Sequence, residues 1–202
     1  MTVLIANYGM GNVGSIANMI RKAGGNPVVS DDPAAIAVAE KLVLPGVGAF
    51  DQGMQALGDS GLLGSIREAV SNGVPVLGIC LGMQLMMESS EEGKLPGLGF
   101  VPGEVLKFPV GNAMPRVPHM GWGRITLKKG SPLFPEYEDE QRYYFVHSYY
   151  VSCRDVGDVV ATTVHGLEFV AAFNRGNLYG VQFHPEKSHR FGMELFRRFL
   201  AI

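Results

Sequence analysis

Cys80 is the residue whose surroundings best fit a chemical role, that of a nucleophile. It lies in Gly78-Ile79-Cys80-Leu81-Gly82, the cysteine form of the GxSxG turn that joins a strand to a helix and exposes a nucleophile. The two glycines leave room for a strained turn, and the N-terminus of the following helix favours a thiolate. Considered alone, the pattern has a second reading, because a free cysteine is most often a small buried residue.

A second motif supplies the base that a thiol nucleophile needs. In Val181-Gln182-Phe183-His184-Pro185-Glu186, residues two apart in an extended segment face the same side, so His184 and Glu186 can point into one site. Pro185 fixes its own backbone and favours extended geometry at His184. With Cys80 they predict a triad in which the carboxylate orients the imidazole and the imidazole takes the thiol proton. The remaining histidines are interpreted as structural or binding residues: His119, His147, His165 and His189.

The third candidate is a backbone site for a developing oxyanion. Leu44-Pro45-Gly46-Val47-Gly48 closes an expected strand, and a Gly-x-Gly backbone can turn an N–H group toward the reacting carbonyl. We expect the N–H groups of Val47 and Leu81 to serve there, with Gly46 and Gly48 giving the loop its freedom. The alternative is an ordinary turn at the end of a strand.

A glycine motif near the N-terminus favours a different chemistry. Gly9-Met10-Gly11-Asn12-Val13-Gly14 has the GxGxxG spacing of dinucleotide-binding folds, and Asp31 and Asp32 follow where such folds keep a ribose-binding acid. The residues left over are too few for a usual substrate domain. We therefore interpret the motif as a tight turn between strand and helix, and keep a nicotinamide- or flavin-binding module as an alternative.

The elements that must position these residues alternate between strand and helix in the first ninety residues. The expected strands cover residues 3–6, 27–29, 41–44 and 75–79. The expected helices follow Asn12 as far as Gly24-Gly25, carry an apolar stripe over residues 62–70, and cover residues 83–88. This alternation predicts an α/β fold with a mostly parallel sheet flanked by helices and a ligand site at the C-terminal ends of the strands.

The rest of the chain predicts a smaller antiparallel section and a last helix. From about residue 99 to 181 the pattern changes to strands and turns, with hairpin-like pieces around residues 121–123 and 174–177. The last helix is expected to carry one apolar stripe, formed by Leu195, Phe196, Phe199 and Leu200. With no repeat and no linker, we expect residues 1–202 to form a single domain.

Composition excludes several classes of function. Of the 202 residues 47% are hydrophobic, and a net charge of −2 without basic clusters argues against binding to nucleic acid or an acidic membrane. The N-terminus lacks the features of a signal peptide, and no segment has the roughly 18 uninterrupted apolar residues of a membrane span. Two cysteines without a CxxC motif favour neither a disulfide framework nor a zinc site. We expect a cytoplasmic protein without a metal.

The motifs together resemble one family. Gly-Ile-Cys-Leu-Gly-Met-Gln at 78–84 and Gly-Val-Gln-Phe-His-Pro-Glu at 180–186 are similar to the signatures of class I (triad-type) glutamine amidotransferases, and the resemblance covers nearly the whole chain. Within that family the chain resembles the glutaminase subunits of imidazole glycerol phosphate synthases. This finer resemblance is carried by residues 7–12, 44–50, 119–122, 144–149 and 187–188. The first of these stretches also accounts for the glycine motif. One departure is Gly123, where that subfamily usually has Asn.

The resemblance implies a reaction and a flavodoxin-like fold. It implies that glutamine binds with its amide at Cys80, with its amino-acid end held by Gln84 and by the backbone near Ser148 and Tyr149. A cysteinyl thioester then forms, ammonia leaves and water completes the hydrolysis. No cofactor is implied. A stand-alone γ-glutamyl hydrolase or peptidase of the same fold remains an alternative.

The resemblance also implies a partner. Ammonia would pass to a separate cyclase subunit, a (β/α)₈ barrel that forms a heterodimer with this chain and makes imidazole glycerol phosphate and an aminoimidazole carboxamide ribotide for histidine biosynthesis. The implied interface includes Asn12, Trp122, Tyr144 and Lys187. We expect the free chain to be a poor glutaminase, because a flip of the Val47 peptide between its two glycines could switch the oxyanion site.

Overall fold

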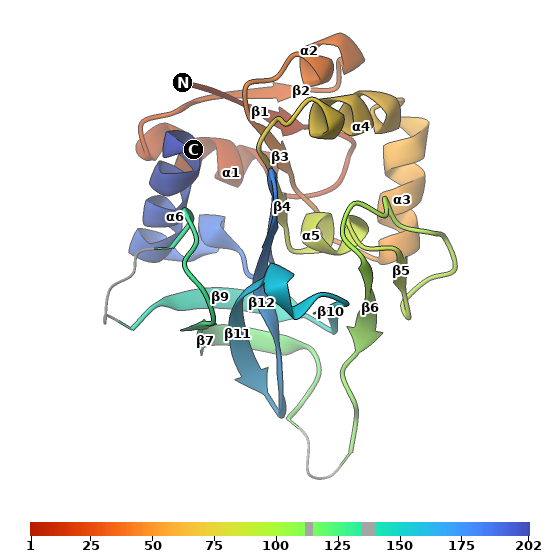
Figure 1. The fold of residues 1–202 in the computed structure, drawn as a ribbon, viewed down its shortest axis with the longest axis vertical. Coiled ribbons are helices and arrows are strands. Elements are labelled where there is room, and N and C mark those ends of the chain that lie inside the picture. Colours follow the sequence, from red (N-terminus) through yellow and green to blue (C-terminus); the bar gives the residue numbers. More distant parts are fainter. Residues whose placement is uncertain (112–114, 135–139) are drawn as a thin grey trace.

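The computed structural model describes residues 1–111, 115–134 and 140–202, and a mixed sheet runs through its centre (Figure 1). One half of this sheet is parallel, with its strands in the spatial order β2-β1-β3-β4-β13. These strands are β1 (Thr2–Ala6), β2 (Asn26–Ser30), β3 (Leu42–Leu44), β4 (Val76–Ile79) and β13 (Leu178–Val181). This is the flavodoxin-like order, which predicts a ligand site beyond the C-terminal ends of the strands.

Helices cover both faces of the parallel half (Figure 1). They are α1 (Val13–Lys22), α2 (Pro33–Ala37), α3 (Phe50–Asp59), α4 (Leu63–Ser71), α5 (Leu81–Leu85) and α6 (His189–Ala201), with single 3₁₀ turns η1 (Val156–Asp158) and η2 (Pro185–Lys187). Successive strand residues point to opposite faces. Val3 and Ile5 accordingly belong to the core beneath α1 and α6, and Leu4 and Ala6 to the core beneath α3, α4 and α5.

The second half of the main sheet is largely antiparallel. Its strands are β5 (Ser89–Ser90), β6 (Gly103–Lys107), β8 (Thr126–Leu127), β10 (Tyr149–Cys153), β11 (Val159–His165) and β12 (Leu167–Arg175). Strands β7 (His119–Arg124) and β9 (Arg142–His147) form a separate two-stranded antiparallel sheet. In Figure 1 this pair crosses the region below α6 and so reaches the end of the parallel strands.

Most of the expected elements are present, with corrections at four places. The α/β fold with a parallel sheet, flanking helices and an antiparallel section is confirmed. Helices α2 and α3 were not predicted, and the helix expected at 83–88 covers Leu81–Leu85. The hairpin expected around residues 121–123 is wrong, because these residues lie inside strand β7. There Gly123 packs so closely on Phe145 that a Cβ atom would lie 2.9 Å from its ring.

Within the described residues, no helix is long and apolar enough to cross a membrane. The hairpin expected around residues 174–177 is confirmed, because those residues connect the antiparallel strands β12 and β13. The single-domain organisation stays a prediction.

Candidate active site

Cys80 lies in a strained turn between β4 and α5. Its φ of 53° is in the left-handed region that non-glycine residues rarely adopt, and its backbone N–H donates to the carbonyl of Val181 at 2.8 Å. The flanking glycines are required for space: a Cβ atom on Gly82 would lie 1.9 Å from the carbonyl oxygen of Leu44, and one on Gly78 would lie 2.8 Å from that of Gly82. The GxCxG spacing therefore reflects backbone contacts that only glycine permits.

His184 reaches the same place from the neighbouring strand. Strands β4 and β13 pair in parallel with Ile79 opposite Val181, so Cys80 and the segment that begins at Gln182 leave the sheet side by side. The Nδ1 atom of His184 lies 2.8 Å from Oε1 of Glu186, and the two side chains are 3% and 1% exposed. His184 itself is extended, as expected, but the extended segment ends there because Pro185 begins the 3₁₀ turn η2. Proline suits the first position of such a turn, and histidine and glutamate still meet.

The backbone of His184 is clamped by two elements. Its N–H donates to the carbonyl of Tyr144 on strand β9 at 2.8 Å. The hydroxyl of Ser188 donates to the carbonyl of His184 at 2.7 Å and accepts from the N–H of Tyr144 at 3.0 Å. The backbones of His184 and Tyr144 and the hydroxyl of Ser188 are therefore bonded to one another. These bonds restrict movement of the imidazole away from Cys80.

The electrostatics around His184 favour its protonated form. Burial alone would lower the pKa of its imidazole, but the neighbouring Cys80 and Glu186 raise the pKa further than burial lowers it, to about 10. Oε2 of Glu186 is buried with no hydrogen-bond partner among the described residues, so the carboxylate acts through Oε1. An imidazolium held in this way stabilises a thiolate next to it.

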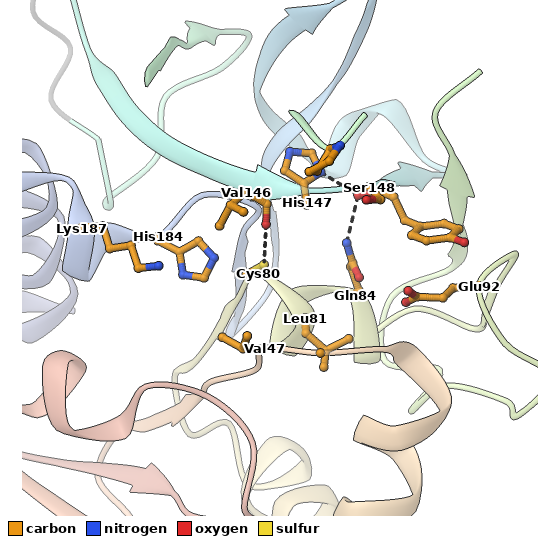
Figure 2. A pocket seen from close by; sticks show the side chains of 13 residues that line it. Val47, Cys80, Leu81, Gln84, Glu92, Val146, His147, Ser148, His184 and Lys187 are labelled. Carbon is orange, nitrogen blue, oxygen red and sulfur yellow. Dashed lines mark hydrogen bonds between the residues drawn. The ribbon is translucent and has the colours of Figure 1, made fainter. Parts of the chain in front are cut away.

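These groups open into a cavity of about 310 Å³ (Figure 2). In Figure 2 Cys80, His184 and Lys187 lie on one side of the cavity, and Gln84 and Glu92 on the other. Several of the residues that the sequence predicted as substrate-binding line it: Val47, Gly48, Leu81, Gln84, Ser148 and Tyr149. Gly46 does not line it but packs behind the nucleophile, where a Cβ atom would lie 2.6 Å from the N atom of Gly82.

Two backbone N–H groups at the cavity are free to bind an oxyanion. No hydrogen bond within the described residues uses the N–H of Val47 or of Leu81, the first residue of α5. The Val47 side chain is 51% exposed, and Gly48 has a φ of 124°. Val47 and Leu81 both line the cavity, so their unpaired N–H groups are candidates for an oxyanion site.

The glycine motif at 9–14 lies against this loop. The buried hydroxyl of Tyr8 donates to the carbonyl of Pro45, and a Cβ atom on Gly11 would lie 2.9 Å from that of Pro45. By contrast, a Cβ atom on Gly14 would meet nothing within 4 Å. In a dinucleotide fold the third glycine allows close packing of helix on strand. The motif therefore lacks that feature and serves the loop beside the nucleophile.

Sequence reasoning missed Glu92. Its carboxylate lines the cavity, accepts a hydrogen bond from the N–H of Phe50 at 2.9 Å, and has its pKa raised chiefly by burial. It sits in a charged, glycine-containing segment that reads as solvated surface, so no local signal marks it. Gln182 was also missed: it is fully buried, and its amide nitrogen lies 3.8 Å from the Cys80 sulfur.

Three of the four expected interface residues lie together. The Lys187 ammonium is 5.9 Å from the centre of the Tyr144 ring, and Trp122 meets that ring edge-on at 6.2 Å. Trp122 also stacks on His189 and is 46% exposed. The fourth residue, Asn12, instead caps α1, where its side chain accepts from the N–H of Ser15.

The chain has relatives over its whole length. A family model described as glutamine amidotransferase class-I matches residues 4–202. Imidazole glycerol phosphate synthase subunit HisH 2 of Methanococcus maripaludis is 48% identical over 98% of this chain and 98% of its own length. The corresponding HisH 2 subunit of Pseudomonas aeruginosa is 43% identical over 99% of each chain. The HisH subunit of Moorella thermoacetica is 46% identical over 98% of this chain and 93% of its own.

Solved structures share the fold at lower identity. The structure of PurLQS from Thermotoga maritima matches with a TM-score of 0.76 and 20% identity, covering 99% of this chain and 97% of that one. A structure described as a glutamine amidotransferase gives a TM-score of 0.76 at 18% identity over 98% and 97% of the two chains. At this identity the likeness concerns the fold alone.

Proposed function

This chain belongs to the class-I glutamine amidotransferase family, and on that premise we propose that it is the glutaminase subunit of an imidazole glycerol phosphate synthase. The observation that carries the proposal is the pairing of β4 with β13, which brings Cys80 and the His184–Glu186 pair to one cavity. The relatives with that name are 43–48% identical over nearly the full chain, which supports the specific reaction.

The proposed reaction proceeds through a thioester. The Cys80 thiolate attacks the side-chain amide carbon of glutamine, and the N–H groups of Val47 and Leu81 stabilise the negative charge that forms on the carbonyl oxygen. The C–N bond breaks as His184 gives its proton to the departing nitrogen, which releases ammonia. His184 then accepts a proton from the water that attacks the thioester, so that glutamate leaves and the thiolate is restored.

The other end of glutamine carries one positive and one negative charge, and the opposite side of the cavity suits it. The carboxylate of Glu92 faces the cavity beside Gln84 and can bind the α-ammonium group. The Gln84 amide nitrogen already donates to the carbonyl of Tyr149 at 3.0 Å. We therefore assign Gln84 to holding the backbone of Ser148 and Tyr149 in place beside the substrate.

Glu92→Gln is expected to raise the KM for glutamine by about tenfold to a hundredfold, the loss of one hydrogen bond to a charged group, with little change in kcat. The side-chain oxygen of the residue substituted at position 92 can still accept from the N–H of Phe50, so the fold is kept. Steady-state glutaminase kinetics measure the effect, and Glu68→Gln on the exposed face of α4 is the matched control. A fall in kcat at unchanged KM would contradict this assignment of Glu92.

The partner in this proposal is the cyclase subunit, a (β/α)₈ barrel that forms a heterodimer with this chain in the cytoplasm. Trp122, Tyr144 and Lys187 would form part of the surface that meets it. Lys187 lines the cavity and also lies over the Tyr144 ring, which supports an exit for ammonia beside these two residues. Ammonia would leave on that side toward the cyclase.

The free chain is expected to hydrolyse glutamine slowly and to reach its full rate only with the cyclase and its phosphorylated nucleotide. The physical reason is that the loop around Val47 can change its peptide orientation between two glycines at small steric cost. A shift from about 1% to 99% of the active orientation needs roughly 5.5 kcal/mol of differential binding, which a protein interface plus a ligand can supply.

Glutamate formation should be measured for the free chain, for the purified pair, and for the pair with nucleotide. Failure of the two chains to form a complex would contradict the proposed function. A complex that forms while the free chain already runs at the full rate would contradict only the regulation. Turnover of γ-glutamyl peptides by the free chain without any partner would favour the alternative of a stand-alone hydrolase.

A further inference from the structure

Three histidines that the triad does not use cluster beside the cavity: His119 and His147 are buried, and His165 is half-buried. The rings of His119 and His165 stack at 4.3 Å between centres, and His147 meets His119 edge-on at 5.2 Å. Phe108 and Phe169 contact the cluster edge-on or tilted. His147 itself lines the cavity, and Figure 2 shows it beside Ser148, above Gln84.

The hydrogen bonds of the cluster fix where the protons are. Nδ1 of His147 lies 2.7 Å from the carbonyl oxygen of Tyr149, and a carbonyl can only accept, so Nδ1 carries the hydrogen. Nε2 of His147 must then be an acceptor if the ring is neutral. The Nδ1 atom of His119 is 3.3 Å from it and has to be the donor. His119 thus selects one tautomer of His147, and that tautomer donates to Tyr149.

Burial keeps both rings neutral, as this arrangement requires. It lowers the pKa of His147 to about 3 and that of His119 to about 4. A proton on Nε2 of His147 would face the hydrogen on Nδ1 of His119. The neutral pair therefore has a single consistent arrangement of hydrogens across the working range of pH.

The cluster is connected to the nucleophile through the substrate wall. The carbonyl of Tyr149, which accepts from His147, also accepts from the amide of Gln84 at 3.0 Å. Gln84 donates in turn to the side-chain oxygen of Gln182 at 3.1 Å, and the nitrogen of Gln182 faces the Cys80 sulfur at 3.8 Å. Because the side-chain oxygen of Gln182 accepts from Gln84, the side-chain nitrogen of Gln182 is the atom that faces the sulfur.

We propose that His147 is a positioning residue for glutamine and that His119 locks it in the donating tautomer. The pair holds the carbonyl of Tyr149, and with it the backbone of Ser148 and Tyr149 and the amide of Gln84, in the orientation that receives the amino-acid end of the substrate. This inference rests on the proposed function. It assigns the pair an effect on substrate binding and none on proton transfer at Cys80.

The test compares variants that remove or keep one donor, in the complex with the cyclase and its nucleotide. His147→Leu removes the donor to Tyr149 and should raise the KM for glutamine about tenfold, with kcat changed less than about threefold. His147→Asn places its amide nitrogen where Nδ1 stood and should recover most of that loss. His119→Phe keeps the ring packing but frees the tautomer of His147, so its KM should lie between wild type and His147→Leu.

A second readout separates binding from general damage. Alkylation of Cys80 by iodoacetamide needs the thiolate but no bound glutamine, so its rate should stay within about twofold of wild type in all variants. His165→Phe is the matched control, because His165 stacks on His119 but hydrogen-bonds outward to the carbonyl of Arg116. Its KM should be unchanged.

The inference is overturned if His147→Leu keeps the KM of wild type, if His147→Asn is as impaired as His147→Leu, or if alkylation slows in parallel with hydrolysis. Equal increases in KM for His165→Phe and His119→Phe would likewise overturn it, because they would show that the cluster contributes only packing. Should His147→Leu not fold, as judged by its melting temperature, the comparison of His147→Asn and His119→Phe with wild type decides. The wild-type complex in the same assay reports on the proposed function separately, because its hydrolysis of glutamine does not depend on any variant.

Discussion

Cys80→Ala is expected to abolish glutamine-dependent synthesis while the assembled synthase still uses ammonium salts. In the proposed reaction the sulfur acts only in releasing ammonia, and the later reaction would take place in the partner chain. Nucleophile and base work as one unit, so the loss of either should lower kcat by several orders of magnitude. The substitution is also small enough to keep the turn, because alanine adds no atom to the close contacts of Gly78 and Gly82.

The measurement is the rate of the complete complex with glutamine and, separately, with ammonium at a pH that supplies free ammonia. Cys153→Ala is the matched control, since Cys153 is half-buried at the end of β10 and lies outside the cavity. Absence of ammonium-driven turnover in a correctly assembled complex would show that Cys80 does more than release ammonia. Near-normal turnover with glutamine would remove it from the triad.

His184→Ala should be almost as inactive as Cys80→Ala, whereas Glu186→Gln should be milder. In the proposed mechanism histidine moves the proton in both half-reactions, while glutamate only orients the imidazole through one 2.8 Å contact and stabilises its charge. Glu186 is one of the groups that raise the pKa of His184 to about 10. Its neutralisation should lower that pKa, so the imidazolium that protonates the leaving nitrogen is lost at a lower pH than in wild type.

The check is to measure kcat/KM across pH for wild type, His184→Ala and Glu186→Gln, each in complex with the cyclase. For Glu186→Gln the alkaline limb of the profile should move to lower pH. Glu194→Gln should leave it in place, because Glu194 is half-buried on α6, pairs with Arg198 and lies outside the cavity lining. Equal losses in His184→Ala and Glu186→Gln would mean that the two roles are wrongly divided. An alkaline limb that stays fixed in Glu186→Gln would show that Cys80 alone sets the charge of the imidazole.

The parts that sequence reasoning predicted are those with local causes. The turn at Cys80 needs glycines at fixed positions because backbone atoms approach within contact distance, and that requirement is readable as GxCxG. The alternation of apolar strands with helices predicted the parallel half of the sheet, and adjacency of β4 and β13 then brought His184 to Cys80.

The parts that it missed depend on contacts between distant segments. Glu92 enters the cavity because its carboxylate accepts from the N–H of Phe50. The residues next to Glu92 and Phe50 in the sequence carry no pattern that predicts this pairing. Helix α3 has glycines and no side-chain cap, so its local propensity is weak and its buried face decides it. The residues at 121–123 look like a turn by composition, yet pairing with β9 continues through both glycines.

The register of β4 on β13 also bears on how the molecule fluctuates. The nucleophile and the base emerge from two central strands joined by a continuous ladder, and such ladders exchange their amide hydrogens only when the whole domain opens. The segment at 45–48 follows the short strand β3, and the described residues offer its N–H groups no hydrogen-bond acceptor. The proposed oxyanion segment can therefore rearrange at a lower free-energy cost than the β4–β13 ladder, so we expect that the activity can be turned down without loosening the fold.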